Sequence, residues 1–226
     1  MKLKLIDKKP EVPNVYSFIW QPDQPVTWQA GQYLHYILPH PQEDDRGTAR
    51  WFTISAAPFE KHIRLTTRFD TQRSSTFKQA LQKLQIGDEI ESDDGPKGTF
   101  VIQPNASRHY FIAGGIGITP FRSILAQLDH DNKPFNIELL YANRDQDLVF
   151  GDELRELEMK HRDFHIHTFL DGRRIDETAL KMCSEDDKCI FYLSGPRPMV
   201  ENYEHLLKDL GVAEERIKLD YFPGYN

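Results

Sequence analysis

The sequence predicts two domains, an antiparallel Greek-key β-barrel of the all-β class followed by an α/β domain with a doubly wound parallel sheet. The first hundred residues hold short segments rich in aromatic and β-branched residues, separated by turn residues. After Pro104, apolar runs of strand length alternate with segments of helical periodicity. Residues 103–107 form the expected linker, so we expect the β-barrel domain at 1–104 and the α/β domain at 105–226.

The β-rich half contains four predicted strands and one predicted helix. Residues 63–69 alternate between apolar and polar side chains, which is the period of a half-buried strand. The other strands are expected at 16–20, 32–38 and 50–54. Phe77, Leu81 and Leu84 recur at helical spacing, and they predict a helix over 76–84.

The second half predicts five strands and four helices in alternation. Strands are expected at 110–113, 137–141, 164–169, 189–193 and 217–221, and helices from 120 and at 151–160, 177–183 and 198–210. Thr119 is the expected N-cap of the first helix, with Pro120 at its first position. Gly211 is the expected residue just beyond the end of the last helix.

Composition excludes several classes of function. The net charge of −7 and the absence of long Lys/Arg runs disfavour nucleic acid as a partner. The apolar runs are far shorter than the roughly 20 residues of a membrane-spanning helix, and the N-terminus lacks the features of a signal peptide. Two cysteines supply neither a disulfide framework nor an iron–sulfur cluster. We therefore expect a cytoplasmic protein without a membrane span.

A glycine turn follows the first strand of the α/β half and is the strongest local signal. Gly114, Gly115 and Gly117 precede the predicted helix, whose N–H groups and positive dipole end could receive a phosphate. The turn differs from the dinucleotide fingerprint, because Pro120 stands where that pattern has Gly or Ala. The turn is thus either a nucleotide site or a tight connection between a strand and a helix.

Four motifs in order resemble the ferredoxin–NADP reductase superfamily, and within it the short FAD-only oxidoreductases. They are Arg-Trp-Phe-Thr-Ile-Ser at 50–55, Gly-Pro-Lys-Gly-Thr-Phe at 95–100, the glycine turn at 114–120, and Ser-Gly-Pro-Arg-Pro-Met at 194–199. Each motif alone is weak, but their order and spacing span both halves of the chain. The resemblance implies an FAD-binding barrel at 1–104, an NAD(P)-binding domain at 105–226, and a flavin at the junction of the two.

The resemblance assigns FAD-binding roles to residues of the β-rich half. Arg50 would neutralise the FAD pyrophosphate, Phe52 would pack on the flavin ring, and Thr53 would place its hydroxyl near flavin N5. Without the other motifs, this segment reads as an ordinary aromatic strand. The further residues assigned to FAD are Trp51, Arg68, Ser74, Ser75 and Thr76. The last three open the predicted helix, where Ser75 or Thr76 could equally be a simple cap.

The resemblance also assigns a nicotinamide nucleotide to the second half. Its pyrophosphate would lie on the glycine turn, and its adenosine ribose near Asn143 and Arg144. Arg144 could pair with a 2′-phosphate and so favour NADPH over NADH, or it could face solvent or pair with Asp145 or Asp147. The residues assigned to the nucleotide are Gly114, Gly115, Gly117, Thr119, Pro120, Asn143, Arg144, Gly195, Pro196 and Met199.

Two residues of the second half receive roles in hydride transfer. Ser194 would lie beside the nicotinamide, where many relatives carry Cys, or it could be the cap of a strand-to-helix turn. Phe222 would cover the flavin, or it could be a core residue. Thr53, Ser194 and Phe222 are thus the candidate catalytic residues, and the flavin itself carries the chemistry.

The expected function is transfer of hydride from NADPH or NADH to FAD, and of electrons to a separate protein or small-molecule acceptor. Two alternatives stay open: an FAD-binding electron-relay subunit without nicotinamide chemistry, and an α/β nucleotide-binding module without flavin. His165 and His167 could bind a metal ion together from one strand, but the sequence does not indicate a third ligand, so no metal is expected.

Overall fold

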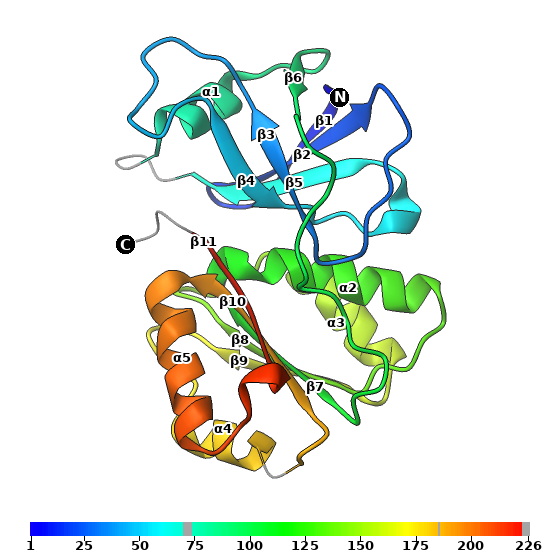
Figure 1. The fold of residues 1–226 in the computed structure, drawn as a ribbon, viewed down its shortest axis with the longest axis vertical. Coiled ribbons are helices and arrows are strands. Elements are labelled where there is room, and N and C mark those ends of the chain that lie inside the picture. The colour runs from blue at the N-terminus through cyan, green and yellow to red at the C-terminus, as the bar shows by residue number, and fades with distance from the viewer. Residues whose placement is uncertain (70–73, 185, 223–226) are drawn as a thin grey trace. The chain divides into compact units, whose positions relative to one another are not determined.

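The computed structural model describes residues 1–69, 74–184 and 186–222, without the side chains of 182–184, 221 and 222. The chain forms two compact units, Met1–Val101 and Ile102–Asn226 (Figure 1). The functional division predicted at 1–104 and 105–226 lies near this boundary and stays a prediction. Among the described residues, none of the helices is long and apolar enough to cross a membrane.

The first unit is built on a six-stranded antiparallel sheet with the strand order β4-β3-β6-β1-β2-β5. Its strands are β1 (Lys2–Val12), β2 (Val15–Pro22), β3 (Tyr33–Ile37), β4 (Ala49–Thr53), β5 (Ile63–Arg68) and β6 (Glu89–Glu91), and its helix is α1 (Thr76–Lys83). The neighbouring pairs β3-β6, β6-β1 and β2-β5 join strands that are not consecutive in the chain, as Greek-key connections require. The all-β class predicted for this half is confirmed.

Strands β1 and β6 escaped prediction from the sequence. The first carries four lysines and buries only Leu3 and Leu5 completely, so its apolar pattern is sparse. The second has three residues, with Ile90 as its buried member. Both lie inside the sheet, because β1 pairs with β2 and β6, and β6 also pairs with β3.

One buried cluster holds the first unit together. Its largest fully buried side chains come from strands β2 and β3 and from α1; they are Phe18, Trp20, Tyr36 and Phe77. Phe77 and Leu81 form the buried face of α1, as their spacing predicted. Ser75 is the cap of this helix and accepts a hydrogen bond from the Lys78 backbone N–H over 3.3 Å.

The second unit is a five-stranded parallel sheet with the order β11-β10-β7-β8-β9. Its strands are β7 (His109–Gly114), β8 (Ile137–Ala142), β9 (Phe164–Phe169), β10 (Ile190–Pro196) and β11 (Ile217–Phe222). Helices α2 (Thr119–His130) and α3 (Gly151–Lys160) lie on one face, and α4 (Glu177–Ser184) and α5 (Arg197–Asp209) on the other (Figure 1). The doubly wound α/β prediction is confirmed.

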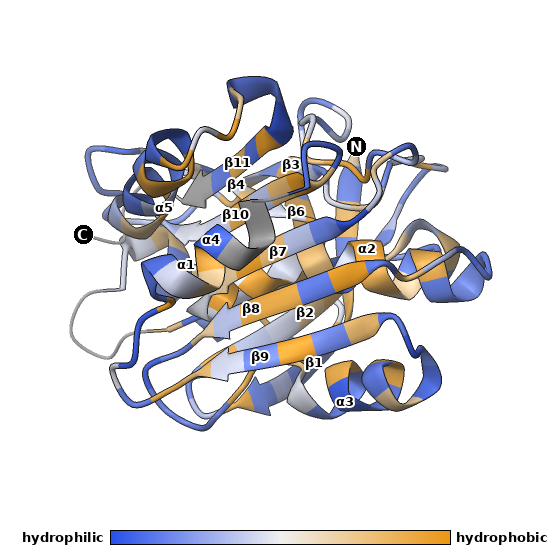
Figure 2. Cartoon of the chain, turned by 90° about the horizontal axis from the view of Figure 1, so that it is seen from below, coloured by the Kyte–Doolittle hydropathy of each residue, from blue (hydrophilic) through white to orange (hydrophobic). Residues whose placement is uncertain are grey.

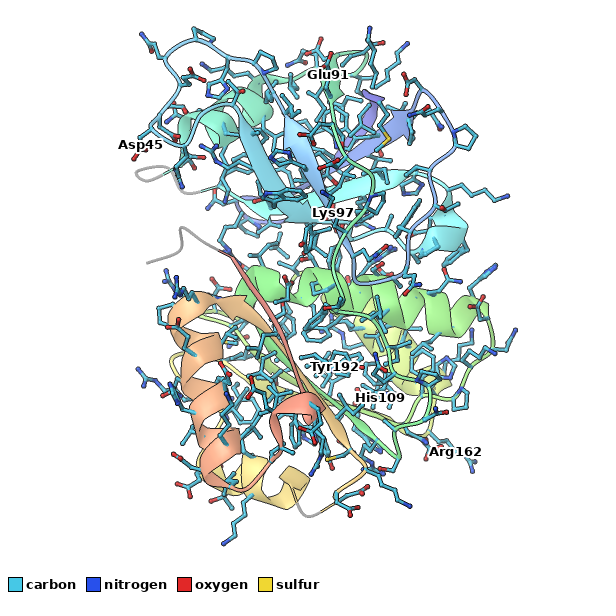
Figure 3. All side chains as sticks on the ribbon, viewed as in Figure 1. Asp45, Glu91, Lys97, His109, Arg162 and Tyr192 are labelled. Carbon is cyan, nitrogen blue, oxygen red and sulfur yellow. The ribbon has the colours of Figure 1, made fainter. Side chains whose placement is uncertain are left out.

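Hydropathy follows the position of each strand in this sheet. Strand β7 is buried along its whole length, whereas the edge strand β9 alternates between hydrophobic and hydrophilic residues (Figure 2). His109 and Tyr192 are buried on neighbouring strands with ring centroids 6.0 Å apart (Figure 3). A parallel sheet covered on both faces requires such continuous burial in its central strands.

The start of α2 differs from the prediction. A 3₁₀ turn over Gly115–Ile118 runs directly into the helix, so Thr119 is already helical and is not the N-cap. Its hydroxyl instead donates a hydrogen bond to the Ile116 carbonyl over 3.1 Å. The end of α5 agrees with the prediction, since Gly211 follows the C-cap Leu210 with φ +83°.

Candidate functional site

The carboxyl edge of the parallel sheet gathers most of the residues predicted for the nucleotide. Gly114 at the end of β7 is level with Ala142 at the end of β8, and Ala113 is level with Ser194 on β10. Asn143 follows β8 directly. Edges of this kind are where open α/β sheets bind ligands, and the strand register thus brings three of the predicted segments together.

Two glycines of the turn serve packing. A Cβ atom on Gly117 would lie 2.2 Å from the Ser194 carbonyl oxygen, and one on Gly114 would lie 2.3 Å from the Met199 sulfur. Gly117 therefore faces the backbone of β10, where no side chain has room. Met199 also lies near Gly195, whose Cβ would come within 3.0 Å of the Met199 methyl carbon. At these positions the tight strand-to-helix connection accounts for the glycines.

Gly115 is different. Its φ is +53°, in the left-handed region, and a Cβ atom there would meet only the Asn143 Oδ1, at 3.7 Å. Its carbonyl accepts a hydrogen bond from the Tyr141 hydroxyl over 3.1 Å, which fixes the orientation of the peptide. Space beside a fixed glycine is what close approach of a phosphate to the backbone needs.

The position of the 3₁₀ turn determines which backbone N–H groups are available to hydrogen-bond a bound anion. Because it begins at Gly115, the N–H groups without an intrahelical partner are those of Gly115, Ile116 and Gly117. Thr119 and Pro120 are buried and lie beyond this first turn. They support the turn structurally, and the backbone of 115–117 supplies its donors.

Asn143 is held in a small loop after β8. Its Nδ2 donates to the Asp145 carboxylate over 3.0 Å and to the Asp147 carbonyl over 3.2 Å. The same Asp145 oxygen accepts the Asp147 backbone N–H over 3.1 Å. Arg144 is exposed next to this loop.

Ser194 is fully buried, and its hydroxyl donates to the Asp220 carboxylate over 3.1 Å. The two residues are directly opposite each other on the parallel strands β10 and β11. The sequence offered no pattern that singled out Asp220, because only the strand register brings it to Ser194. Pro196 is the N-cap of α5. The side chain of Phe222 lies outside the described residues.

Arg50 is the second residue of β4, and its guanidinium contacts the loop that precedes this strand. Its Nη1 donates to three carbonyls, those of Arg46, Gly47 and Ala49, over 2.8, 2.8 and 2.6 Å. Its Nη2 donates to the Asp44 carboxylate over 2.7 Å. Its Nε is buried and has no hydrogen-bond partner among the described residues.

The N-terminus of α1 lies beside Arg50. The Arg50 guanidinium carbon is 5.5 Å from the centre of the Phe77 ring, and Phe52 packs 5.8 Å from the same ring. The Thr76 hydroxyl accepts the Asp44 backbone N–H over 3.1 Å and contacts the His40 ring over 3.0 Å. Arg50, Phe52, Ser75 and Thr76 are thus assembled at one place, as the sequence predicted for a single ligand.

The other residues predicted to bind FAD do not share the contacts described around Arg50. Trp51 is 45% exposed and stacks on His35 at 4.1 Å, on the face of β4 opposite Arg50 and Phe52. Thr53 is buried at the end of β4. The Arg68 carbonyl accepts a hydrogen bond from Lys78 of α1 over 2.9 Å, and Ser74 accepts one from Gln79.

The surroundings of Arg50 and of Gly115 are each compatible with a bound phosphate group, as the sequence predicted for FAD and for the nicotinamide nucleotide. A buried guanidinium N–H without a partner next to a helix N-terminus suits a phosphate. An open, left-handed glycine before a buried helix suits a second phosphate. His167 and His161, in contrast, pair with Glu138 and Asp129 over 2.8 and 2.6 Å.

The structure thus has a two-domain architecture, in which a six-stranded antiparallel unit is followed by a parallel α/β sheet with a glycine turn at its carboxyl edge. Residues 111–205 match the family model of the oxidoreductase NAD-binding domain. The whole chain has the fold of solved structures of the ferredoxin–NADP reductase type, the superfamily that its motifs resemble.

Individual relatives agree with this placement. A flavohemoprotein of Rhodopirellula baltica is 25% identical over 217 residues, which is 86% of this chain and 53% of that protein. The FAD/NAD-binding domain of a nitric oxide dioxygenase from Vibrio cholerae O1 biovar El Tor has a TM-score of 0.83, 22% identity and 98% coverage of both chains. A ferredoxin NADP+ reductase from Neisseria gonorrhoeae with bound FAD and NADP has a TM-score of 0.82, 19% identity and 98% coverage of both. The chain spans about half the length of the curated relatives it matches.

Proposed function

We propose that this chain is a reductase that takes hydride from NADPH or NADH onto a bound FAD and delivers the electrons to a separate acceptor. FAD, when bound, accepts hydride at N5 and releases electrons singly or as a pair. The observation that carries the proposal is the presence of two phosphate-compatible places in one chain, one at Arg50 and one at Gly115.

The first unit holds FAD in this proposal. Arg50 and the N-terminus of α1 bind the pyrophosphate, since a guanidinium and a helix N-terminus both favour anions. Phe52 packs on the flavin ring, and the Thr53 hydroxyl hydrogen-bonds near its N5. Support comes from the Arg50 Nε, which is buried without a partner among the described residues.

The second unit holds the nicotinamide nucleotide. Backbone N–H groups of 115–117 bind its pyrophosphate, and Ser194 lies beside the nicotinamide. The protein contributes orientation and the exclusion of water, and proximity is the main source of rate. Support comes from the burial of Ser194 at the carboxyl edge of the sheet, close to the glycine turn.

Arg144 pairs with a 2′-phosphate in this proposal, so that NADPH is preferred. One oxygen of its neighbour Asp145 is already engaged by Asn143 and by the Asp147 N–H. This internal engagement supports an Arg144 that is available to a ligand. Replacement of Arg144 by Ala should then raise KM for NADPH and leave KM for NADH unchanged.

The acceptor is proposed by class. A flavohemoprotein among the relatives is consistent with a haem protein as acceptor; an oxygenase component, a ferredoxin or flavodoxin, or a small molecule are the other candidates. An acceptor screen with reduced protein distinguishes these classes by the rate of flavin reoxidation.

The decisive experiment is anaerobic stopped-flow reduction of the purified protein with NADH and NADPH in parallel. The expected result is a yellow protein absorbing at about 450 nm that bleaches on mixing. A yellow protein that neither nucleotide bleaches supports the electron-relay subunit instead. A colourless protein that does not bind added FAD supports the nucleotide-binding module without flavin.

Two variants test the two places separately. Arg50→Ala should lose FAD, and a fully yellow variant contradicts the FAD site. Gly115→Val should slow reduction by nicotinamide and retain the flavin. Gly172→Val is the matched control, because Gly172 also has a left-handed φ, +81°, with nothing within 4 Å of its Cβ position.

A further inference from the structure

We propose that the Asp44 carboxylate competes with the FAD pyrophosphate for Arg50 and thereby sets the affinity of this chain for FAD. The inference rests on the proposed function, since it assumes that Arg50 binds FAD. It concerns a residue outside the four motifs that carry the resemblance to the superfamily.

Asp44 already receives the donors that a phosphate would take. One carboxylate oxygen accepts the Arg50 Nη2 over 2.7 Å and the Arg46 backbone N–H over 3.0 Å. The other oxygen accepts the Arg46 Nη2 over 3.0 Å. Two guanidinium groups and a backbone N–H that converge on one carboxylate make the donor set typical of a bound phosphate.

The position of Asp44 brings this anion to the predicted pyrophosphate site. Its backbone N–H donates to the hydroxyl of Thr76, the first residue of α1, over 3.1 Å. Its carboxylate is therefore tied to the same arginine, and its backbone to the same helix N-terminus, that FAD is proposed to use. Two anions at one arginine repel each other, so FAD must displace the carboxylate or share Arg50 with it.

The two side chains of the pair are partly buried. The side chains of Arg50 and Asp44 are 15% and 21% exposed. Burial opposes ionisation of Asp44, but the hydrogen bonds from Arg46 and the charges of Arg50 and Arg46 outweigh it and lower the pKa of Asp44 to about 2. Asp44 therefore carries a negative charge at neutral pH.

The test measures FAD affinity directly, by quenching of flavin fluorescence when FAD is added to the chain stripped of flavin. Asp44→Asn removes the charge and keeps a side-chain carbonyl for the Arg46 N–H. The expected result is a Kd for FAD about tenfold lower than that of the unchanged chain, because tenfold corresponds to about one charge-assisted hydrogen bond.

Asp45→Asn is the matched control. Asp45 lies on the same loop and is exposed (Figure 3), and its replacement changes the net charge equally. The control should leave the Kd within about twofold, as expected for a screened surface charge. In an Arg50→Lys background, Asp44→Asn should no longer change the Kd for FAD, since the competition acts through the paired N–H donors of the Arg50 guanidinium.

Two results overturn the inference and spare the proposed function. If Asp44→Asn and Asp45→Asn change the Kd for FAD equally, the effect comes from net charge and not from competition at Arg50. If Asp44→Asn raises the Kd for FAD, Asp44 holds Arg50 in place for FAD. Failure of the unchanged chain and of Asp45→Asn to bind FAD at all refutes the proposed function itself.

Folding of each variant is checked by circular dichroism, and Asp44→Ser replaces Asp44→Asn if the latter does not fold. A measurement on the unchanged chain gives independent evidence. If the FAD pyrophosphate replaces the Asp44 carboxylate at Arg50, the number of anions bound to Arg50 stays the same. The Kd for FAD should then change little with NaCl concentration. A steep loss of affinity with salt contradicts the inference.

Discussion

The buried hydroxyl of Ser194 donates a hydrogen bond to the carboxylate of Asp220, 3.1 Å away on the neighbouring parallel strand. This contact joins β10 and β11 at the edge of the sheet where the nucleotide is proposed to bind. It connects a predicted site residue to one that no motif contains.

Ser194→Ala should lower the free energy of unfolding by about 1 kcal/mol, because it removes a buried donor from a carboxylate. Urea unfolding of Ser194→Ala, Asp220→Ala and the double variant measures the coupling between the two side chains. A coupling energy near zero means that the hydrogen bond contributes nothing to stability.

Gly117→Ala and Gly115→Ala should separate packing from ligand binding. The Cβ atom at Gly117 would meet the β10 backbone at 2.2 Å, which cannot yield without a shift of the strand. We expect a loss of about 3 kcal/mol in the free energy of unfolding. At Gly115 we expect a loss of about 1–2 kcal/mol from the left-handed φ alone, together with a raised KM for the nicotinamide nucleotide.

Urea unfolding and steady-state kinetics measure the two effects. If Gly117→Ala is as stable as Gly115→Ala, the packing role assigned to Gly117 is wrong.

Two places in the sequence show what the pattern of residues could and could not predict. Periodicity located β2, β5, α3 and β9 within a few residues, because each has a regular apolar face. The lysine-rich β1 was missed because its two core residues are surrounded by charged and polar ones. Local pattern is thus sufficient only where a segment buries a continuous face.

The candidate site was predicted at the level of segments and less well at the level of contacts. The motifs located Arg50 and Ser194, but nothing in the sequence linked them to Asp44 and Asp220. The glycines at 114 and 117 resembled phosphate-binding positions, whereas the space beside them is taken by Met199 and by β10. Contacts between distant segments depend on register and packing, which a single sequence does not display.

Because His109 is buried, we predict that the second unit loses stability at acidic pH. Burial lowers the pKa of His109 below its ordinary value of 6.5, and its Nε2 contacts the Gln103 carbonyl over 2.9 Å. The unfolded chain therefore binds a proton more readily than the folded chain, and stability should fall as the pH drops below about 6.5.

Urea unfolding at about pH 7.5 and about pH 5 measures this loss. His109→Gln should show a smaller difference between the two pH values than the unchanged chain. His165→Gln, at an exposed position on β9, should behave like the unchanged chain. Equal pH dependence in all three proteins excludes His109 as the cause.

The ion pair between Glu11 and Arg64 should be costly to break. Both side chains are 7% exposed, their atoms are 2.6 Å apart, and the Arg64 Nε also donates to the Ser17 hydroxyl over 2.9 Å. Glu11→Ala leaves the buried guanidinium without its carboxylate, so a loss of about 3–5 kcal/mol is expected. Thermal unfolding should show recovery of most of this loss in Glu11→Leu combined with Arg64→Met.

The close approach of Gly114 and Gly117 to β10 and α5 also constrains how this chain can vary in evolution or in a mutant library. A larger residue at Gly114 requires a smaller one at Met199, and Gly117 has no compensating partner, because its neighbour is a peptide group. Random mutagenesis of this turn should therefore return Gly at 117 in every folded clone, paired changes at 114 and 199, and the widest choice at 115.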